Sequence, residues 1–392
     1  MTRFSQRLSL EVLDELQGGV VAALQEARLD GIVTESPEDV AYLTGFFHHP
    51  GERPVAVWLG ADGRCVLLVP ELERENAERQ RARAEIVSFP EYPGRVPPFS
   101  YLADAVKPGP RARVGHGGSI GWDRLVALRA ALAVDPVPSD IVTRARYRKH
   151  PAEIALHEEA ARITDRMIAA GIALVRDAIT GGELPTEAEL ASHVTGTGVR
   201  TMYEDHDDVV VVSPLAGALV YAGANSAYPH GLPSGYRLRA GDTFMLSLGC
   251  AVGGRFVEGE RTFVLGEPTP EQRRYHDVVR EAQAIGGRAI APGVECRMAN
   301  LACLQVIRDA GLGRYLRHRQ GHGIGLGMHE PPWLEDGDAT VLEEGMVVSN
   351  EPGLYVPGHA GYRISDSMLV TAAGSRPLTS FARELDATVL PL

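Results

Sequence analysis

Residues 321–332 read GHGIGLGMHEPP and carry the most informative pattern in the chain. Two histidines, His322 and His329, lie in this glycine-rich stretch, and Glu330 follows the second one directly. Glycine permits close backbone approach and unusual dihedral angles, and histidine serves as a metal ligand and as a proton carrier near neutral pH. The stretch therefore predicts a loop that brings two imidazoles to one site, with a structural role for each histidine as the open alternative.

Carboxylates stand in two apolar stretches on either side of this loop. RFVEGERTF carries Glu258 and Glu260 two residues apart, which places both on one face of a strand. Two like charges so placed require a cation, an arginine or a shared proton, and Arg261 and Arg363 are available as partners in a salt-bridge network. VVSNEPGLYV places Glu351 in an apolar strand, where a carboxylate is costly unless it is paired or metal-bound.

Two further segments add polar side chains. AYPHG supplies His230 ahead of the main run of strands, and GYRISDS supplies Arg363, Ser365 and Asp366 after it. Separated segments thus bring histidines and carboxylates to strand or loop positions. This pattern predicts a metal or acid–base site.

Composition limits the classes of protein to consider. The chain has 392 residues, which suits two domains, and a formal net charge of −12, which argues against nucleic-acid binding. The 4 cysteines are scattered without a CxxC pair, so a reducing compartment fits better than a disulfide framework. No stretch resembles a signal peptide or a membrane span, and we expect a cytoplasmic protein.

Periodicity divides the chain into two parts. The first part alternates short apolar strands with helices and predicts a mixed α/β layer. Later runs such as FMLSLGCAV and RFVEGERTF follow one another with few crossover helices, which predicts a curved, mostly antiparallel sheet with helices on one face. The helices are expected at residues 12–29, at 71–85, from Pro151 onward, near 270–291 and near 297–311.

At this point the sequence resembles peptidase family M24, which includes prolidases, aminopeptidase P, methionine aminopeptidase and creatinase. The resemblance rests on SPEDVAYLTGF, RYRKHPAEIALHEEAARITD, GHGIGL, HEPP, EEGMVVSNEPG and GYRISD, in family order and over nearly the whole chain. It implies an α+β protein with a creatinase/prolidase-like N-terminal α/β domain, residues 1–148. A pita-bread catalytic domain with a curved antiparallel sheet is expected over residues 149–392, and a homodimer is expected.

The family resemblance also implies a metal site, from which this chain departs. Family peptidases hold two divalent metals with Asp, Asp, His, Glu and Glu, and the matching positions here are Ser247, Glu258, His322, Glu351 and Ser365. A serine hydroxyl is a poor ligand for a hard divalent ion compared with a carboxylate. What remains is Glu258, His322 and Glu351, a site for one ion at best (Mn, Zn or Co), and a dinuclear centre is not expected.

Three functions stay open. The first is a hydrolase of prolidase or aminopeptidase P type acting on a small peptide, in which His230 and His329 assist the tetrahedral intermediate and Arg363 holds a substrate carboxylate. The second is a metal-independent C–N hydrolase of creatinase type acting on a small polar amide or amidine, with Glu260, Glu258 and His230 as acid–base groups. The third is a non-catalytic peptide-binding homologue. The catalytic residues expected from the resemblance are thus His230, His329, Glu260 and Arg363.

Overall fold

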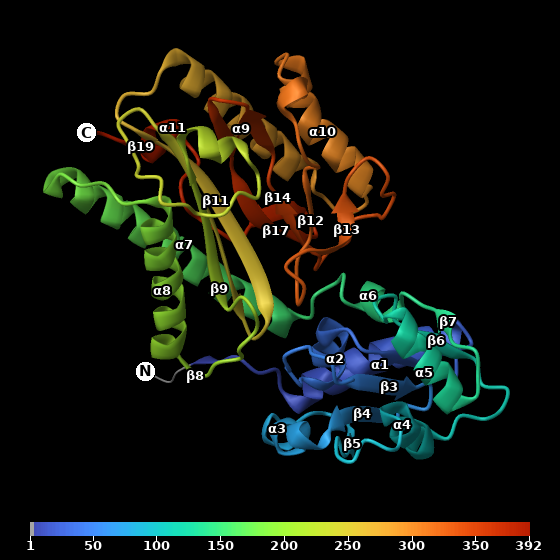
Figure 1. The fold of residues 1–392 in the computed structure, drawn as a ribbon. Helices are drawn as coiled ribbons and strands as arrows, with labels where there is room; N and C mark the ends of the chain where they lie inside the picture. The colour runs from blue at the N-terminus through green and yellow to red at the C-terminus, as the bar shows by residue number, and fades with distance from the viewer. Residues whose placement is uncertain (1–3) are drawn as a thin grey trace. The chain divides into compact units, whose positions relative to one another are not determined.

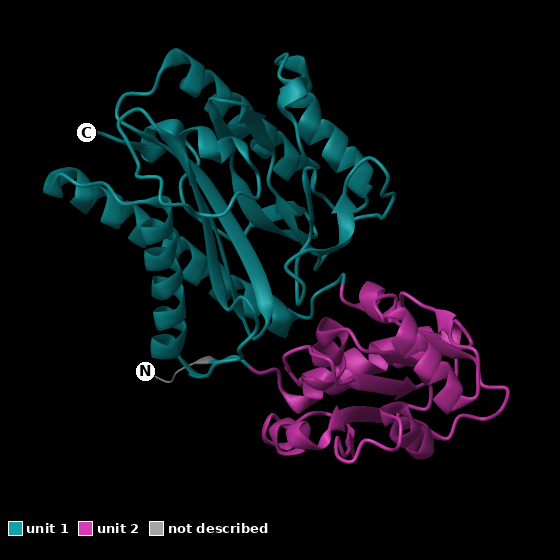
Figure 2. Cartoon of the chain, viewed as in Figure 1, with its two compact units in different colours: residues 1–6, 147–392 teal, residues 7–146 magenta. Residues whose placement is uncertain are grey.

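The computed structural model describes residues 4–392, which form two compact units (Figure 2). Unit 1 consists of residues 4–6 and Tyr147–Leu392, and unit 2 is Arg7–Arg146. The chain passes from unit 2 to unit 1 between Arg146 and Tyr147. Each unit has its own sheet and its own buried apolar core, so each is described by itself.

Unit 2 is built on a six-stranded mixed sheet with the order β5-β4-β3-β2-β6-β7. Its central strands β2, β3 and β4 are buried along their whole length, as expected for strands covered on both faces. The strands are β2 (Gly31–Thr34), β3 (Ala56–Gly60), β4 (Cys65–Pro70), β5 (Glu85–Phe89), β6 (Val114–His116) and β7 (Val137–Pro138). The helices are α1 (Leu10–Glu26), α2 (Pro37–Thr44), α3 (Arg74–Arg79), α4 (Pro98–Val106), α5 (Trp122–Leu132) and α6 (Ile141–Ala145).

The helix expected over residues 71–85 is much shorter than predicted. A 3₁₀ turn at Glu71–Glu73 leads into α3, which ends at Arg79. Arg81 has a φ of 57°, which interrupts the helical backbone, and Glu85 already begins β5. The prediction failed because β5 pairs in parallel with β4, and this long-range pairing outweighs the local helix preference of the charged residues.

Unit 1 is dominated by a nine-stranded sheet whose main path is β13-β12-β14-β17-β11-β10-β9. Every neighbouring pair on this path is antiparallel, and β10 and β11 form a long curved ribbon (Figure 1). The sheet consists of β9 (Ala216–Ala222), β10 (Thr243–Val252), β11 (Arg255–Leu265), β12 (Gly321–Gly323), β13 (Glu330–Leu334), β14 (Val347–Asn350), β17 (Ser365–Thr371), β18 (Gly374–Pro377) and β19 (Val389–Leu390). Two small pairs accompany it: β15 (Gly353–Val356) with β16 (Ala360–Arg363), and β1 (Phe4–Ser5) with β8 (His206–Asp208).

Three helices of unit 1, those that begin at Pro151, near 270 and near 297, start close to where the sequence predicts, and the other two were not predicted. The long helix α7 has Pro151 in its first turn and a capping box formed by His150 and Glu153, which satisfies the free N–H groups of the helix end. The helix predicted near 270–291 is α9, and the one predicted near 297–311 is α10. The helices are α7 (Pro151–Gly181), α8 (Glu187–Asp205), α9 (Pro270–Ala289), α10 (Cys296–Asp309) and α11 (Leu385–Thr388).

These helices lie on one face of the large sheet. A Cβ on Gly259 of β11 would lie 3.1 Å from Thr164 of α7, and Asp366 of β17 accepts a hydrogen bond from Gln283 of α9. Gly259 and Asp366 are paired in register. Because side chains alternate along a strand, Glu258, Glu260 and Ser365 point to the opposite face. The predicted α+β class with a curved antiparallel sheet is thereby confirmed, and the face opposite these helices carries the candidate site.

Within residues 4–392, no helix is both long and apolar enough to cross a membrane.

The core of unit 1 predicts a specific acid sensitivity. His276 on α9 is 1% exposed, and neither ring nitrogen has a hydrogen-bond partner among residues 4–392. Burial lowers the pKa of His276 to about 4, so the folded state holds this ring neutral while the unfolded chain protonates near its ordinary pKa. The stabilising effect of the neutral ring is complete above the unfolded pKa and is lost as pH falls toward the folded one.

The free energy of unfolding of the wild type should fall when the pH is lowered from about 7.5 to about 5. We expect this fall to be about 2 kcal/mol smaller in His276→Leu. Urea unfolding at the two pH values measures the difference. Equal losses in both proteins would show that His276 is not the group responsible.

Candidate active site

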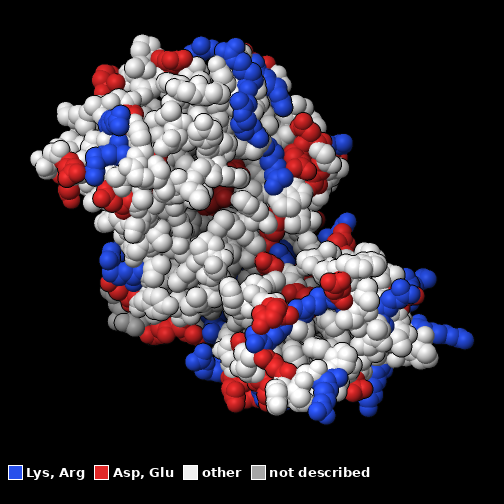
Figure 3. Space-filling model, in the orientation of Figure 1, with Lys and Arg blue, Asp and Glu red and all other residues white. Residues whose placement is uncertain are grey.

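Strand register brings the predicted residues of three strands together. Ser247 on β10 lies opposite Glu260 on β11, and Glu260 in turn lies opposite Ser365 on β17. Glu258 is two residues before Glu260 on the same face of β11. On the face of the molecule shown in Figure 3, acidic atoms lie at the bottom of a hollow in unit 1 bordered mostly by uncharged residues.

A serine hydroxyl group holds the Glu258 carboxylate. Ser365 Oγ donates to Glu258 Oε1 at 2.8 Å, and the backbone N–H of Glu258 donates to Ser367 Oγ at 3.0 Å. Burial, reinforced by the negative charge of Glu351, raises the pKa of Glu258 to about 8. A buried carboxylate with a raised pKa tends to hold a proton or to bind a cation.

His322 lies between two carboxylates. Its Nε2 is 3.2 Å from Glu351 Oε1 and 3.7 Å from Glu258 Oε2. Its Nδ1 lies 2.9 Å from the carbonyl oxygen of Gly323, which can only accept, so Nδ1 carries a proton and Nε2 faces the acids. Burial opposes charging of this ring, but Glu258 and the hydrogen bond to Glu351 raise the pKa of His322 to about 9.

Glu351 is not inside a strand, as the sequence had suggested, but directly follows β14. Burial works against its ionisation, yet the hydrogen bond and charge of His322 lower the pKa of Glu351 to about 2. Ser349 Oγ also donates to Glu351 at 3.4 Å. Because Glu351 follows the end of β14, its side chain reaches His322. This partner offsets the free-energy cost of burying the carboxylate.

His329 lies beside His322, where it could also serve as a metal ligand in addition to its predicted acid–base role. Its ring centroid is 4.1 Å from that of His322 at an interplanar angle of 71°. Donor atoms of Glu258, His322 and His329 all lie within 4.8 Å of one another, a grouping that can hold a metal ion. Burial, followed by the nearby His322, lowers the pKa of His329 to about 4, so its ring is neutral and has a free lone pair for a ligand or a proton.

Arg363 and Glu260 form the other half of the site. Arg363 is 3% exposed, and its Nε lies 2.5 Å from Glu260 Oε2. Its Nη1 donates to Tyr355 Oη at 3.0 Å and to the Pro229 carbonyl at 3.4 Å, and its Nη2 donates to Ser247 Oγ at 3.1 Å. Ser247 Oγ in turn donates to Glu260 Oε1. The guanidinium therefore already has protein partners for all three of its nitrogens.

His230 is an exposed residue of the loop that follows the 3₁₀ turn Gly223–Ala227. This loop is attached to the site through its neighbour Pro229, whose carbonyl accepts from Tyr221 Oη at 3.0 Å as well as from Arg363. The structure thus places the His230 segment at the Arg363 side of the site.

Several residues of the site were not found from the sequence. Tyr355 and Tyr221 line the Arg363 side, and His318 lies 2.8 Å from Tyr355 Oη through its Nε2. Tyr355 stands four residues after Glu351 in a quoted stretch, so its position was a signal that could have been used. The others stand in stretches with no distinguishing pattern.

Glu330 fixes the loop that carries His329. Its Oε1 lies 3.1 Å from Lys149 Nζ, both side chains are almost fully buried, and its Oε2 accepts from the backbone N–H of Gly327 at 3.1 Å. Breaking a buried pair leaves one charge without its partner. We expect Lys149→Met to lower the free energy of unfolding by about 3 kcal/mol.

The double change Lys149→Met/Glu330→Gln provides the control for this prediction. It removes both charges and should recover most of the loss, as measured by urea unfolding. A double variant as unstable as Lys149→Met would contradict the assignment to the ion pair.

Comparison with known proteins agrees with this architecture. Residues 155–372 match metallopeptidase family M24, and residues 19–147 match the creatinase/prolidase N-terminal domain. The fold and its histidine–carboxylate cluster thus define a two-domain protein with the pita-bread architecture of prolidases. The chain belongs to metallopeptidase family M24.

Individual relatives are similar over nearly their full length. The "Probable dipeptidase PepE" of Mycobacterium tuberculosis is 32% identical over 97% of this chain and 98% of its own. The "Xaa-Pro dipeptidase" of Lactobacillus delbrueckii is 29% identical over 97% of this chain and 99% of its own. The crystal structure of dipeptidase PepE from Mycobacterium ulcerans superimposes with a TM-score of 0.85 at 29% identity, covering 98% and 100% of the two chains.

Proposed function

We propose that this protein is a hydrolase that cleaves the C–N bond of a dipeptide-sized substrate, with at most one divalent metal ion in its site. The observation that carries this proposal is the convergence of Glu258, Glu351 and His329 on His322. The relatives named as dipeptidases and as an Xaa-Pro dipeptidase support a small peptide as the substrate class.

The residues present fit one ion. The buried Nε2 of His322 faces the carboxylates of Glu351 and Glu258, so it would offer a lone pair to an ion that displaces its proton. Glu258 and His322 would hold the ion, with His329 or Glu351 as the third ligand. A mixed nitrogen and oxygen set suits Zn, Mn or Co. A bound ion of this kind lowers the pKa of a water and polarises a carbonyl.

The residues present do not fit two ions. Ser247 and Ser365 stand where carboxylate ligands would be needed, and each donates its hydroxyl proton to a neighbouring glutamate instead. Glu260 is neutralised by the guanidinium of Arg363. The positive charge of Arg363 therefore compensates this half of the site, and a dinuclear centre does not form.

We assign roles to the remaining groups from their contacts. Glu258, once ionised, would accept a proton from the attacking water and return it to the leaving nitrogen. His329 and His230 stand beside the reacting carbonyl and stabilise its oxygen. Arg363 positions Glu260 rather than a substrate carboxylate, because its nitrogens are already bonded to the protein.

A second function is favoured by one specific observation, the unequal pair of acids around His322. The pKa of Glu258 is raised while that of Glu351 is lowered, and two titratable groups with separated pKa values can act as acid and base without a metal. This second function is that of a creatinase-type C–N hydrolase, with a small polar amide or amidine as substrate. The histidine that creatinase has at the position of Ser365 is missing here.

Activity on a panel of Xaa-Pro dipeptides, measured after chelation and again after addition of Mn²⁺, tests the proposal. We expect hydrolysis that is lost on chelation and restored by the ion. Activity that survives chelation unchanged would favour the creatinase-type function, and no hydrolysis of any dipeptide or amide would favour a peptide-binding homologue.

We also propose that the protein works as a homodimer in the cytoplasm. All four cysteines, Cys65, Cys250, Cys296 and Cys303, are buried free thiols, which suits a reducing compartment. Light scattering on the purified protein measures the mass of the assembly, and a mass equal to one chain would contradict the dimer.

A further inference from the structure

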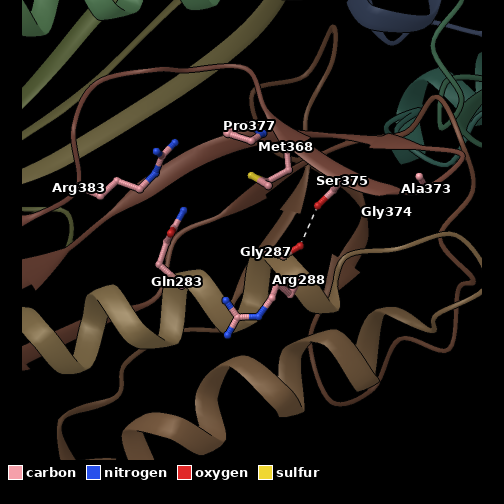
Figure 4. A pocket seen from close by; sticks show the side chains of 10 residues that line it. Gln283, Gly287, Arg288, Met368, Ala373, Gly374, Ser375, Pro377 and Arg383 are labelled. Carbon is pink, nitrogen blue, oxygen red and sulfur yellow. Dashed lines mark hydrogen bonds between the residues drawn. The ribbon is translucent and has the colours of Figure 1, made fainter.

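A groove lies between α9 and the hairpin of β17 and β18, with a volume of about 530 Å³. Figure 4 shows its side chains around a common open space, with Arg383 and Gln283 on one side, Arg288 below, and Met368 and Pro377 above. We call it the α9–β18 groove. It is lined by Gln283, Arg288, Met368, Ser375, Pro377 and Arg383, among others.

The α9–β18 groove is separate from the candidate active site. Ser365 on β17 points toward Glu258, whereas Asp366 and Met368 belong to the other side of the strand, where α9 lies. Side chains alternate along a strand, so the groove and the site occupy opposite faces of the sheet. A ligand in the groove would not touch the histidine–carboxylate cluster.

The charge of the groove is positive in a protein whose formal net charge is −12. Two guanidinium groups, Arg288 and Arg383, line it, and none of the lining residues is acidic. Within residues 4–392, the side chain of Arg288 has no ion pair or hydrogen bond. Arg383 has the carboxylates of Asp366, Glu384 and Asp165 near it, so Arg288 is the cation that remains free to attract an anion.

The carboxylate that is bonded to Arg383 is shared with a second arginine. Asp366 is fully buried and accepts from Arg261 at 2.8 Å, from Thr379 at 2.6 Å, from Gln283 at 2.6 Å and from Arg383 at 2.6 Å. One negative charge is thus shared between two arginines. Arg383 uses its Nε for Asp366 and its Nη2 for the Thr379 carbonyl, and a guanidinium has five N–H donors in all.

The walls of the groove also determine the kind of anion. Met368 and Pro377, together with Ala284, form an apolar surface beside the two arginines. A guanidinium matches the planar, two-oxygen geometry of a carboxylate, and a thioether side chain adapts to short hydrocarbon groups. We propose that the α9–β18 groove binds a small carboxylate that carries a short apolar group.

Methyl NMR tests this assignment directly, because the Met368 methyl group reports from inside the groove. The spectrum of chelated protein labelled at its methionine methyl groups is recorded during titration with isovalerate, and Met368→Leu assigns the signal. We expect a saturable shift of the Met368 signal with isovalerate. A much weaker shift is expected with isoamyl alcohol, which lacks the charge. The same is expected with inorganic phosphate, which lacks the hydrocarbon group.

Arg288→Gln supplies the decisive variant, because the exposed side chain of Arg288 makes no hydrogen bond or ion pair within residues 4–392. We expect its dissociation constant for isovalerate to rise at least about tenfold, the effect of losing one charge-assisted hydrogen bond. Arg280→Gln, two turns earlier on α9 and outside the groove, is the matched control and should bind as the wild type does. An unmoved Met368 signal, or equal binding in Arg288→Gln and wild type, would overturn the proposal. Neither outcome depends on hydrolytic activity.

Discussion

The double variant Ser247→Asp/Ser365→Glu is expected to bind two divalent ions per chain, where the wild type binds at most one. The two changes restore carboxylates at the positions where the family peptidases have metal ligands. Without metal, the new carboxylates lie beside Glu260 and Glu258 in a buried site, and the like charges destabilise the fold. With metal, binding to the folded state alone restores stability.

The melting temperature with and without Mn²⁺ measures this effect, together with metal content after gel filtration. The variant should melt well below the wild type after chelation and should gain more than the wild type from the ion. Ser247→Asn/Ser365→Gln has the same side-chain sizes without the charges, so it should show no such gain. A charged variant that responds to Mn²⁺ as this control does would contradict the ligand assignment.

Alanine at His322 is expected to lower kcat/KM for Xaa-Pro dipeptides by about a thousandfold, which corresponds to about 4 kcal/mol of transition-state stabilisation. The imidazole is the group that both Glu258 and Glu351 approach, so its loss leaves two acids facing each other without a base or a ligand between them. The His322→Ala variant should therefore lose both metal binding and proton transfer.

His193→Ala is the matched control, because His193 is exposed on α8 and contacts none of the site residues identified above. Its kcat/KM should equal that of the wild type. If His322→Ala retains most of the wild-type activity, the reaction does not pass through this cluster, and a site elsewhere in the chain must be sought.

Much of the fold could be predicted because its signals are local. Pro151 and the polar residues around it mark the start of α7, and the apolar runs of β10 and β11 determine where these strands lie. The helix predicted over residues 71–85 ends early because the strand that begins at Glu85 pairs with β4, a contact between distant segments. Charged residues without glycine or proline do not reveal such pairing.

The members of the candidate site could be proposed from the sequence, but their contacts could not. Glu258, His322 and Glu351 were identified by residue type and order, which the family resemblance supplied. The hydrogen bond from Ser365 to Glu258 depends on the register between β11 and β17, and the engagement of Arg363 by Glu260 depends on side-chain rotamers. Neither register nor rotamer is encoded in a short stretch of sequence.

Metal content per chain tests the central claim most directly. Protein prepared without added metal is loaded separately with Mn²⁺, Co²⁺ or Zn²⁺, freed of loosely bound ions and analysed by mass spectrometry of the elements. Because Ser247 and Ser365 donate to glutamates and Arg363 neutralises Glu260, we predict no more than one ion per chain with each metal. Two tightly bound ions per chain would contradict the account.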